Sequence, residues 1–168
     1  MCNNQFLSPH FSLKEMTKSQ TAVEHGIANV PSPEAVENLR RLCANTLEPL
    51  REALNLPVVV SSAYRTKALN SLLAHASDRS QHMLGQAADF HVSPSGSTTE
   101  SRRELLIKAF RLIITSEQID FDQLILYPNF IHVSYVSKER NSRNILLGMR
   151  NGKLGYGKCS VEKALKIQ

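Results

Sequence analysis

Residues 121–136 read FDQLILYPNFIHVSYV, two β-rich apolar runs on either side of Pro128-Asn129. This pattern predicts a β-hairpin, because β-branched and aromatic residues favour strands and a proline–asparagine pair favours a turn. If the turn has two residues, Ile125 faces His132 across the hairpin. A weaker second hairpin is predicted where Asn151-Gly152 follows the apolar run 145–149.

The chain before residue 121 is mainly helical in pattern. Ser12 and Ser32 are each followed by residues typical of a first helical turn. Apolar residues then recur at three- and four-residue intervals over 36–54, which predicts the main packing helix, kinked at Pro49. Strands are expected at 56–62 and 87–92, and helices near 67–73 and 100–114. Early helices with later antiparallel hairpins favour an α+β fold, an antiparallel sheet with flanking helices.

The size of the chain indicates one domain, residues 1–168. Its 168 residues, of which 42% are hydrophobic, suffice for one core without a stabilising metal or disulfide. The three cysteines form no CxxC pair, so we expect them to be reduced, with Cys43 packed in the core. No segment approaches the ~18 apolar residues of a membrane span, and no signal peptide is evident, which predicts synthesis in the cytoplasm.

The net charge of +5 is concentrated in a basic C-terminal extension, residues 137–168. Clustered cations can bind nucleic acid or an anionic wall polymer by releasing counterions. This segment lacks the interleaved aromatic residues that stack on bases. We therefore interpret it as a solvated face and expect no nucleic-acid partner.

Residues 80–91, SQHMLGQAADFH, contain the densest set of chemically active side chains. A hydrolytic zinc site needs three nitrogen or carboxylate ligands and an open fourth position for water, whose pKa the metal lowers toward ~7. His82 and Asp89 can supply two ligands if Gly85 permits a tight backbone path. The third is His132, on the predicted hairpin, or His91, on the same strand face as Asp89. Spacing leaves both open.

Three motifs resemble one known family. The pattern Ser80-x-His82-x-x-Gly85-x-Ala87-x-Asp89 is followed by FDQLI at 121–125 and IHVSY at 131–135, and SSAYR at 61–65 precedes it. Together they are similar to the zinc D-alanyl-D-alanine carboxypeptidase family, especially its small single-domain branch from bacteria and phages, over about residues 12–136. The resemblance implies the fold of the hedgehog and D-Ala-D-Ala peptidase superfamily.

The resemblance also assigns roles to individual residues. The family's zinc ligands correspond to His82, Asp89 and His132, which selects His132 over His91. Its arginine corresponds to Arg65, which would hold a substrate carboxylate or the developing oxyanion. Ser80 matches the motif serine and would orient the site through hydrogen bonds. Gln123, on the strand that faces His132, is a further candidate for substrate binding.

One residue of the family pattern is absent. The family usually has a glutamate shortly before the second histidine, as general base for the water molecule. Tyr127 stands there, and no carboxylate occurs from Gln123 to Ile131. A phenol with a pKa of ~10 is seldom ionised at neutral pH, so Tyr127 is a poor base. Other bases that the sequence offers are His91 and Glu139, whereas Asp122 is expected to point to the other sheet face.

These observations lead to two expectations. The first is a zinc metallopeptidase that hydrolyses amide bonds in peptidoglycan stem peptides, reaching the wall by export or lysis. The second is a zinc-binding module for wall peptides or a partner protein, with weak or no catalysis because the usual glutamate is absent.

Overall fold

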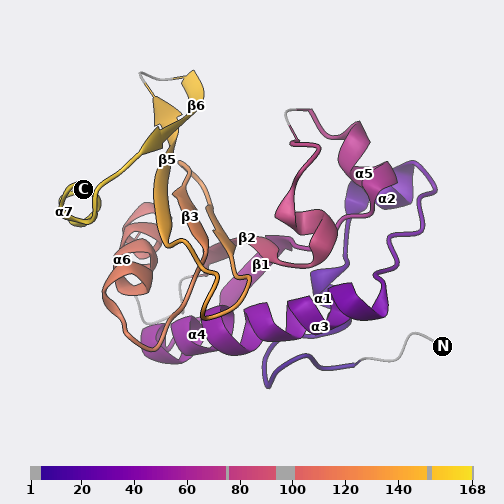
Figure 1. Cartoon of the computed structure of the whole chain (residues 1–168), viewed down its shortest axis with the longest axis horizontal. Helices are drawn as coiled ribbons and strands as arrows, with labels where there is room; N and C mark the ends of the chain where they lie inside the picture. Colours follow the sequence, from indigo (N-terminus) through magenta and orange to yellow (C-terminus); the bar gives the residue numbers. More distant parts are fainter. Residues whose placement is uncertain (1–4, 75, 94–100, 151–152, 168) are drawn as a thin grey trace.

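A six-stranded sheet forms the centre of the fold (Figure 1). The computed structural model describes residues 5–74, 76–93, 101–150 and 153–167. The strand order is β1-β2-β4-β3-β5-β6. Their bounds are β1 Val58–Ser62, β2 Ala87–Val92, β3 Gln123–Leu126, β4 Ile131–Ser134, β5 Asn144–Arg150 and β6 Lys153–Lys158. The predicted α+β class is confirmed, with a mostly antiparallel sheet.

The hairpin predicted over 121–136 is formed by β3 and β4, with Ile125 opposite His132 as expected. Strand β2 pairs antiparallel with β4 and sets Asp89 beside His132. Strands β5 and β6 form the second predicted hairpin, whose turn, Asn151-Gly152, lies outside the described residues.

The sheet departs from the expected antiparallel arrangement at one pairing. Strand β5 runs parallel to β3, with Leu126 beside Leu147. After β4 the chain returns to the beginning of β3, where the Asn144 N–H donates to the Asp122 carbonyl at 2.8 Å. Because β4 already occupies one edge of β3, β5 adds to the other edge in the same direction.

Nine helical segments surround the sheet in the described part of the chain: α1 Leu13–Met16, α2 Gln20–Glu24, α3 Pro33–Leu42, η1 Cys43–Leu47, α4 Glu48–Leu54, α5 Lys67–Leu72, η2 Gln81–Leu84, α6 Arg102–Thr115 and α7 Val161–Leu165. Both predicted serine caps are present, because Ser12 and Ser32 accept from Glu15 and Ala35 backbone N–H groups. No helix among the described residues is long and apolar enough to cross a bilayer.

The irregularity expected at Pro49 takes the form of a π-helical turn, η1, between α3 and α4. Proline has no N–H, so the carbonyl four residues earlier, on Asn45, lacks its helical donor. That carbonyl accepts from the Asp120 N–H at 3.1 Å, and the Thr46 hydroxyl donates to the Asp120 carbonyl at 2.6 Å. The disrupted turn thus anchors the segment that leads into β3.

The two faces of the sheet have different roles. In β2, Ala88, Phe90 and Val92 are fully buried and belong to the core, which α6 covers. The five residues predicted to face the core from α6 are all buried: Leu105, Leu106, Ala109, Phe110 and Ile113. Cys43 is also buried, as expected. Alternation turns Asp89 and His91 to the opposite face, where the polar site lies.

Candidate metal centre

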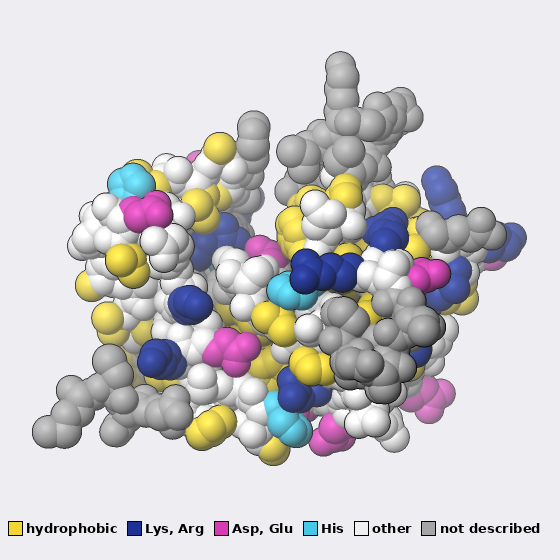
Figure 2. Space-filling view, turned by 180° about the vertical axis from the view of Figure 1, so that it is seen from behind, with side chains coloured by type: hydrophobic (Ala, Val, Ile, Leu, Met, Phe, Trp, Pro, Cys, Tyr) yellow, Lys and Arg dark blue, Asp and Glu magenta, His cyan; other side chains and the backbone are white. Residues whose placement is uncertain are grey.

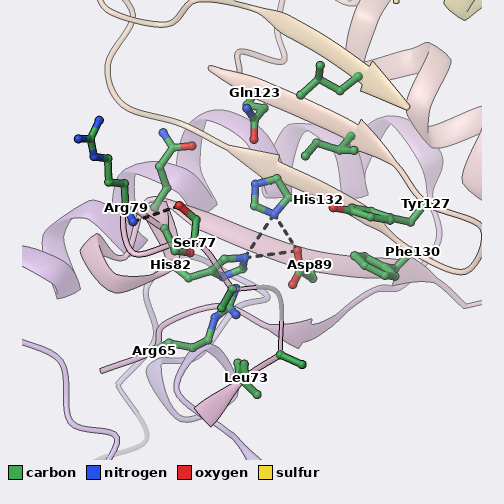
Figure 3. A pocket seen from close by; sticks show the side chains of 16 residues that line it. Arg65, Leu73, Ser77, Arg79, His82, Asp89, Gln123, Tyr127, Phe130 and His132 are labelled. Carbon is green, nitrogen blue, oxygen red and sulfur yellow. Dashed lines mark hydrogen bonds and ion pairs between the residues drawn. The ribbon is translucent and has the colours of Figure 1, made fainter. Parts of the chain in front are cut away.

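Three side chains from three elements converge on one point (Figure 3). They are His82 from η2, Asp89 from β2 and His132 from β4. The His82 Nε2 atom lies 3.3 Å from His132 Nδ1 and 3.4 Å from Asp89 Oδ1, and the latter two atoms are 2.8 Å apart. All three side chains are largely buried, with 3%, 18% and 13% exposed.

This spacing fits a tetrahedral metal ion. Zinc with ligand bonds of about 2.0–2.1 Å separates neighbouring ligand atoms by about 3.3 Å. Two of the three distances match that edge, and the third is shorter by half an ångström. Two imidazoles and one carboxylate are also a donor set that catalytic zinc sites use. The residues present therefore fit a zinc ion with a fourth position open.

The backbone holds His82 in the orientation that a ligand needs. Its Nδ1 lies 2.6 Å from the Ala63 carbonyl oxygen, which can only accept, so Nδ1 carries the proton and Nε2 presents a lone pair to the site. Gly85 ends η2 with a φ of +70°, and a Cβ there would lie 2.4 Å from the Ala35 carbonyl oxygen. The tight path predicted at Gly85 thus lets η2 pack against α3.

The electrostatics of the site favour an ionised Asp89 carboxylate and a neutral His82 imidazole. Burial raises the pKa of Asp89, but its polar contacts with the His132 and His82 rings outweigh burial and hold that pKa well below its usual range. Burial lowers the pKa of His82. A cation is favoured at this point because the carboxylate stays ionised and burial favours a His82 imidazole that can offer a lone pair.

The three ligands line a cavity of about 810 Å³. In Figure 2 the surface is hollowed between the side that carries α5 and the side that carries the β5–β6 hairpin, and the cavity lies in this hollow. Of the residues predicted from the sequence, Arg65, Ser80, Gln123 and Tyr127 all line it. Ser80 precedes η2 but makes no capping hydrogen bond through its side chain.

Arg65 lies beside the ligands on a segment that is fixed at both sides. Asn29 donates to the Tyr64 carbonyl and accepts from the Thr66 N–H, both at 2.9 Å, and the Arg65 N–H donates to the His82 carbonyl. The Arg65 Nε atom is buried without a hydrogen-bond partner among the described residues. Burial lowers the pKa of Arg65. A ligand with an anionic oxygen would satisfy this guanidinium.

The other candidate bases lie elsewhere. His91 is not part of the ligand cluster, and neither His91 nor the exposed Glu139 lines the cavity. Asp122 accepts hydrogen bonds from Gln81 Nε2 at 2.8 Å and from the Ser142 hydroxyl at 2.7 Å, so it braces η2 against the start of β5. Among the described residues, Asp89 is the only carboxylate that lines the cavity.

Several cavity residues were missed in the sequence. Phe130 stacks on Tyr127, and Leu146 of β5 completes one wall. Phe130 could have been found from the hairpin register, since it stands opposite Tyr127. Leu146 could not, because no local pattern indicates that β5 joins β3.

Comparison with protein-family models shows a match over most of the chain. The family described as Peptidase M15 matches residues 9–134, well over half of the chain. The match includes all three candidate ligands and Arg65, and it ends before β5. No curated protein matches the chain.

Proposed function

This chain belongs to the peptidase M15 family, and on that premise we propose that it is a zinc metallopeptidase that hydrolyses amide bonds in peptidoglycan stem peptides. The observation that carries the proposal is the convergence of His82, Asp89 and His132, whose ligand atoms lie within 4.8 Å of one another at the wall of an open cavity. The proposed reaction is of the D-Ala-D-Ala carboxypeptidase or the endopeptidase type, as the resemblance of the sequence motifs implies.

The proposed chemistry divides between the metal and the protein. A bound zinc ion would supply Lewis acidity, which polarises a carbonyl group and acidifies water. His82, Asp89 and His132 would hold it, with His82 oriented through Ala63. Arg65 would bind a substrate carboxylate or the oxyanion that develops at the scissile carbon. Ser80 and Gln123 would hydrogen-bond the peptide on either side.

An efficient peptidase of this type needs a general base that accepts a proton from the attacking water. Asp89 would be committed to the metal, and Tyr127 occupies the position of the usual glutamate. With no other carboxylate lining the cavity among the described residues, a second function is supported. In this alternative the protein binds zinc and wall peptides, or a partner, with weak or no hydrolysis.

Metal analysis combined with a hydrolysis assay tests both functions. The purified protein is expected to bind one zinc ion and to release amino acids from purified peptidoglycan in a reaction that a chelator abolishes. A matched variant, His132→Ala, should lose both properties and remain folded. Bound zinc without release at any pH would reject the peptidase in favour of the binding module. A protein that binds no metal, with His82→Ala unchanged in stability, would reject both.

A further inference from the structure

Strand β5 lies beyond the family match, yet it forms part of the cavity. It pairs with β3 so that Leu146 lies beside Ile125, and both residues line the cavity. On the other side of Ile125 stands His132. These three residues form one row across the sheet face that bears the metal ligands.

The next row along the same face contains two aromatic residues and a glycine, and we call it the aromatic row. Every second residue of a strand points to the same face of the sheet. This row therefore lies about 7 Å along the strands from the row of His132, Ile125 and Leu146. It consists of Phe130, Tyr127 and Gly148. The first two line the cavity. In Figure 3 their rings lie on one side of the ligand cluster and Arg65 lies on another.

The Tyr127 ring is clamped between its two neighbours in this row. Phe130 stacks on it with ring centroids 4.3 Å apart and planes inclined by 14°. On the β5 side, a Cβ at position 148 would lie 2.3 Å from Tyr127 Cδ1 and 2.5 Å from Cε1. The ring can therefore occupy its place only because residue 148 has no side chain.

The position of β5 is itself fixed by polar contacts. Asp122, directly before β3, accepts from the Ser142 N–H at 2.8 Å and from Gln81 on η2. The Tyr127 carbonyl accepts from Arg103 Nη1 at 3.2 Å. These contacts hold the residues directly before β3, the end of β3 at Tyr127 and the segment that leads into β5.

We infer that Phe130, Tyr127 and Gly148 form a specificity subsite that receives an apolar group of the metal-bound ligand, while Arg65 receives its anionic part. Gly148 is the specificity-determining position, because it keeps the Tyr127 ring flat on β5 and leaves room for that group. The inference rests on the metal centre of the proposed function but does not require hydrolysis.

Two hydroxamates test this subsite in the zinc-loaded protein. Acetohydroxamic acid and benzohydroxamic acid carry the same metal-binding group and differ in a methyl against a phenyl substituent. If the phenyl group lies against the aromatic row, benzohydroxamic acid should bind about tenfold more tightly, since a partly buried ring loses contact with water. The ratio of the two dissociation constants, measured by calorimetry, is the readout.

Gly148→Ala should reduce this ratio to near one, because a Cβ there displaces the Tyr127 ring. Gly157→Ala is the matched control, because a Cβ at that glycine of β6 meets nothing within 4 Å, and it should keep the wild-type ratio. Phe130→Ala should also reduce the ratio, which tests the subsite if Gly148→Ala does not fold. Once Tyr127→Ala has removed the ring, adding Gly148→Ala should change nothing more.

Equal affinity of the wild-type protein for both hydroxamates would overturn the inference, as would a Gly148→Ala variant that keeps the ratio. A protein that binds neither zinc nor acetohydroxamic acid would instead reject the proposed function. Binding of acetohydroxamic acid without a preference for the phenyl group would reject the subsite alone.

Discussion

Tyr127 is the residue that bears most directly on whether the proposed peptidase catalyses hydrolysis. It stands opposite Phe130 on the face that carries His132, and the resemblance of the sequence motifs leads us to expect a glutamate at this position. A phenol there gives the cavity an apolar wall but no group that accepts a proton at neutral pH. Binding and catalysis therefore make opposite demands on this position.

Replacing Tyr127 by glutamate should restore the missing base. We expect Tyr127→Glu to raise the rate of zinc-dependent hydrolysis by about 10²-fold, the lower range for a positioned general base. Release of D-alanine from a D-Ala-D-Ala peptide measures it. Tyr127→Gln, similar in size but unable to take the proton, is the control and should give no gain. Equal rates for glutamate and glutamine would indicate that the native chain already has a base elsewhere.

Asn29 fixes the backbone on both sides of Arg65 although it lies far away in the sequence. Its side chain donates to the carbonyls of Thr17 and Tyr64 and accepts from the Thr66 N–H. Removing three hydrogen bonds in a half-buried place should lower the free energy of unfolding by about 1–3 kcal/mol. Urea denaturation of Asn29→Ala measures this loss.

Two asparagine variants serve as controls for this prediction. Asn29→Asp keeps the acceptor for the Thr66 N–H but turns a carboxylate oxygen toward the Thr17 and Tyr64 carbonyls, so it should be no more stable than the alanine variant. Asn38→Ala removes a single hydrogen bond, to the Leu84 carbonyl, at an exposed site and should cost the least. If Asn29→Ala were as stable as Asn38→Ala, Asn29 would not fix the backbone on both sides of Arg65.

At the scale of elements, η2 is positioned by its contact with α3 at Gly85. An alanine there would need both a left-handed φ of +70° and a Cβ 2.4 Å from the Ala35 carbonyl oxygen. The backbone conformation alone costs about 1–2 kcal/mol, and the clash adds to it. We expect Gly85→Ala to lower stability by roughly 3 kcal/mol and to reduce bound zinc, because η2 carries His82.

Gly26→Ala is the matched control for the contact with α3. Gly26 has a similar φ of +63°, but a Cβ there meets nothing within 4 Å. Its alanine variant should be destabilised only by the cost of the left-handed backbone conformation. It should bind zinc as the wild type does. An equal decrease in Tm for the two variants would show that the close contact of Gly85 with α3 does not add to the destabilisation.

Helix α4 holds the segment before α1 through Glu48, and this contact predicts a pH dependence. Burial raises the pKa of Glu48, but hydrogen bonds from the His10 ring and backbone N–H outweigh burial and lower it. A lowered pKa stabilises the fold above the unfolded pKa of about 4.3, and this stabilisation disappears as the pH falls through the folded value.

Glu48→Gln should therefore be less stable than the wild type at pH 6–7, by about 1–2 kcal/mol. The difference should close as the pH falls below about 4. Urea unfolding of both proteins between pH 2 and 7 measures it. A difference that stays constant over this range would show that the charge of Glu48 contributes nothing.

At the scale of the whole molecule, local patterns predicted the elements and tertiary contacts determined the rest. Apolar spacing indicated α6 and its buried face, and the turn at Pro128-Asn129 gave the register of Ile125 with His132. Alternation alone could not choose between His132 and His91, because the choice depends on the pairing of β2 with β4. The parallel pairing of β5, and with it Leu146 in the cavity, depends on long-range contacts that leave no local pattern.

The architecture also predicts how the whole protein responds to metal removal. The core lies on the sheet face away from the candidate ligands, and His82 is held by its hydrogen bond to the Ala63 carbonyl. The metal-free protein should therefore stay folded and melt cooperatively. Free zinc at a hundred times its dissociation constant should stabilise it by about 2.7 kcal/mol, which raises Tm by roughly 5–10 °C.

Calorimetry of the protein with zinc and with a chelator measures this shift. His132→Ala should have the same Tm with zinc and with a chelator, because it lacks one of the three candidate ligands and should not bind zinc. Zinc bound outside the three-residue cluster would instead leave this variant with the full shift. Loss of cooperative melting in the chelated wild type would mean that the metal holds the fold together, which would assign the site a structural role in place of a catalytic or binding one.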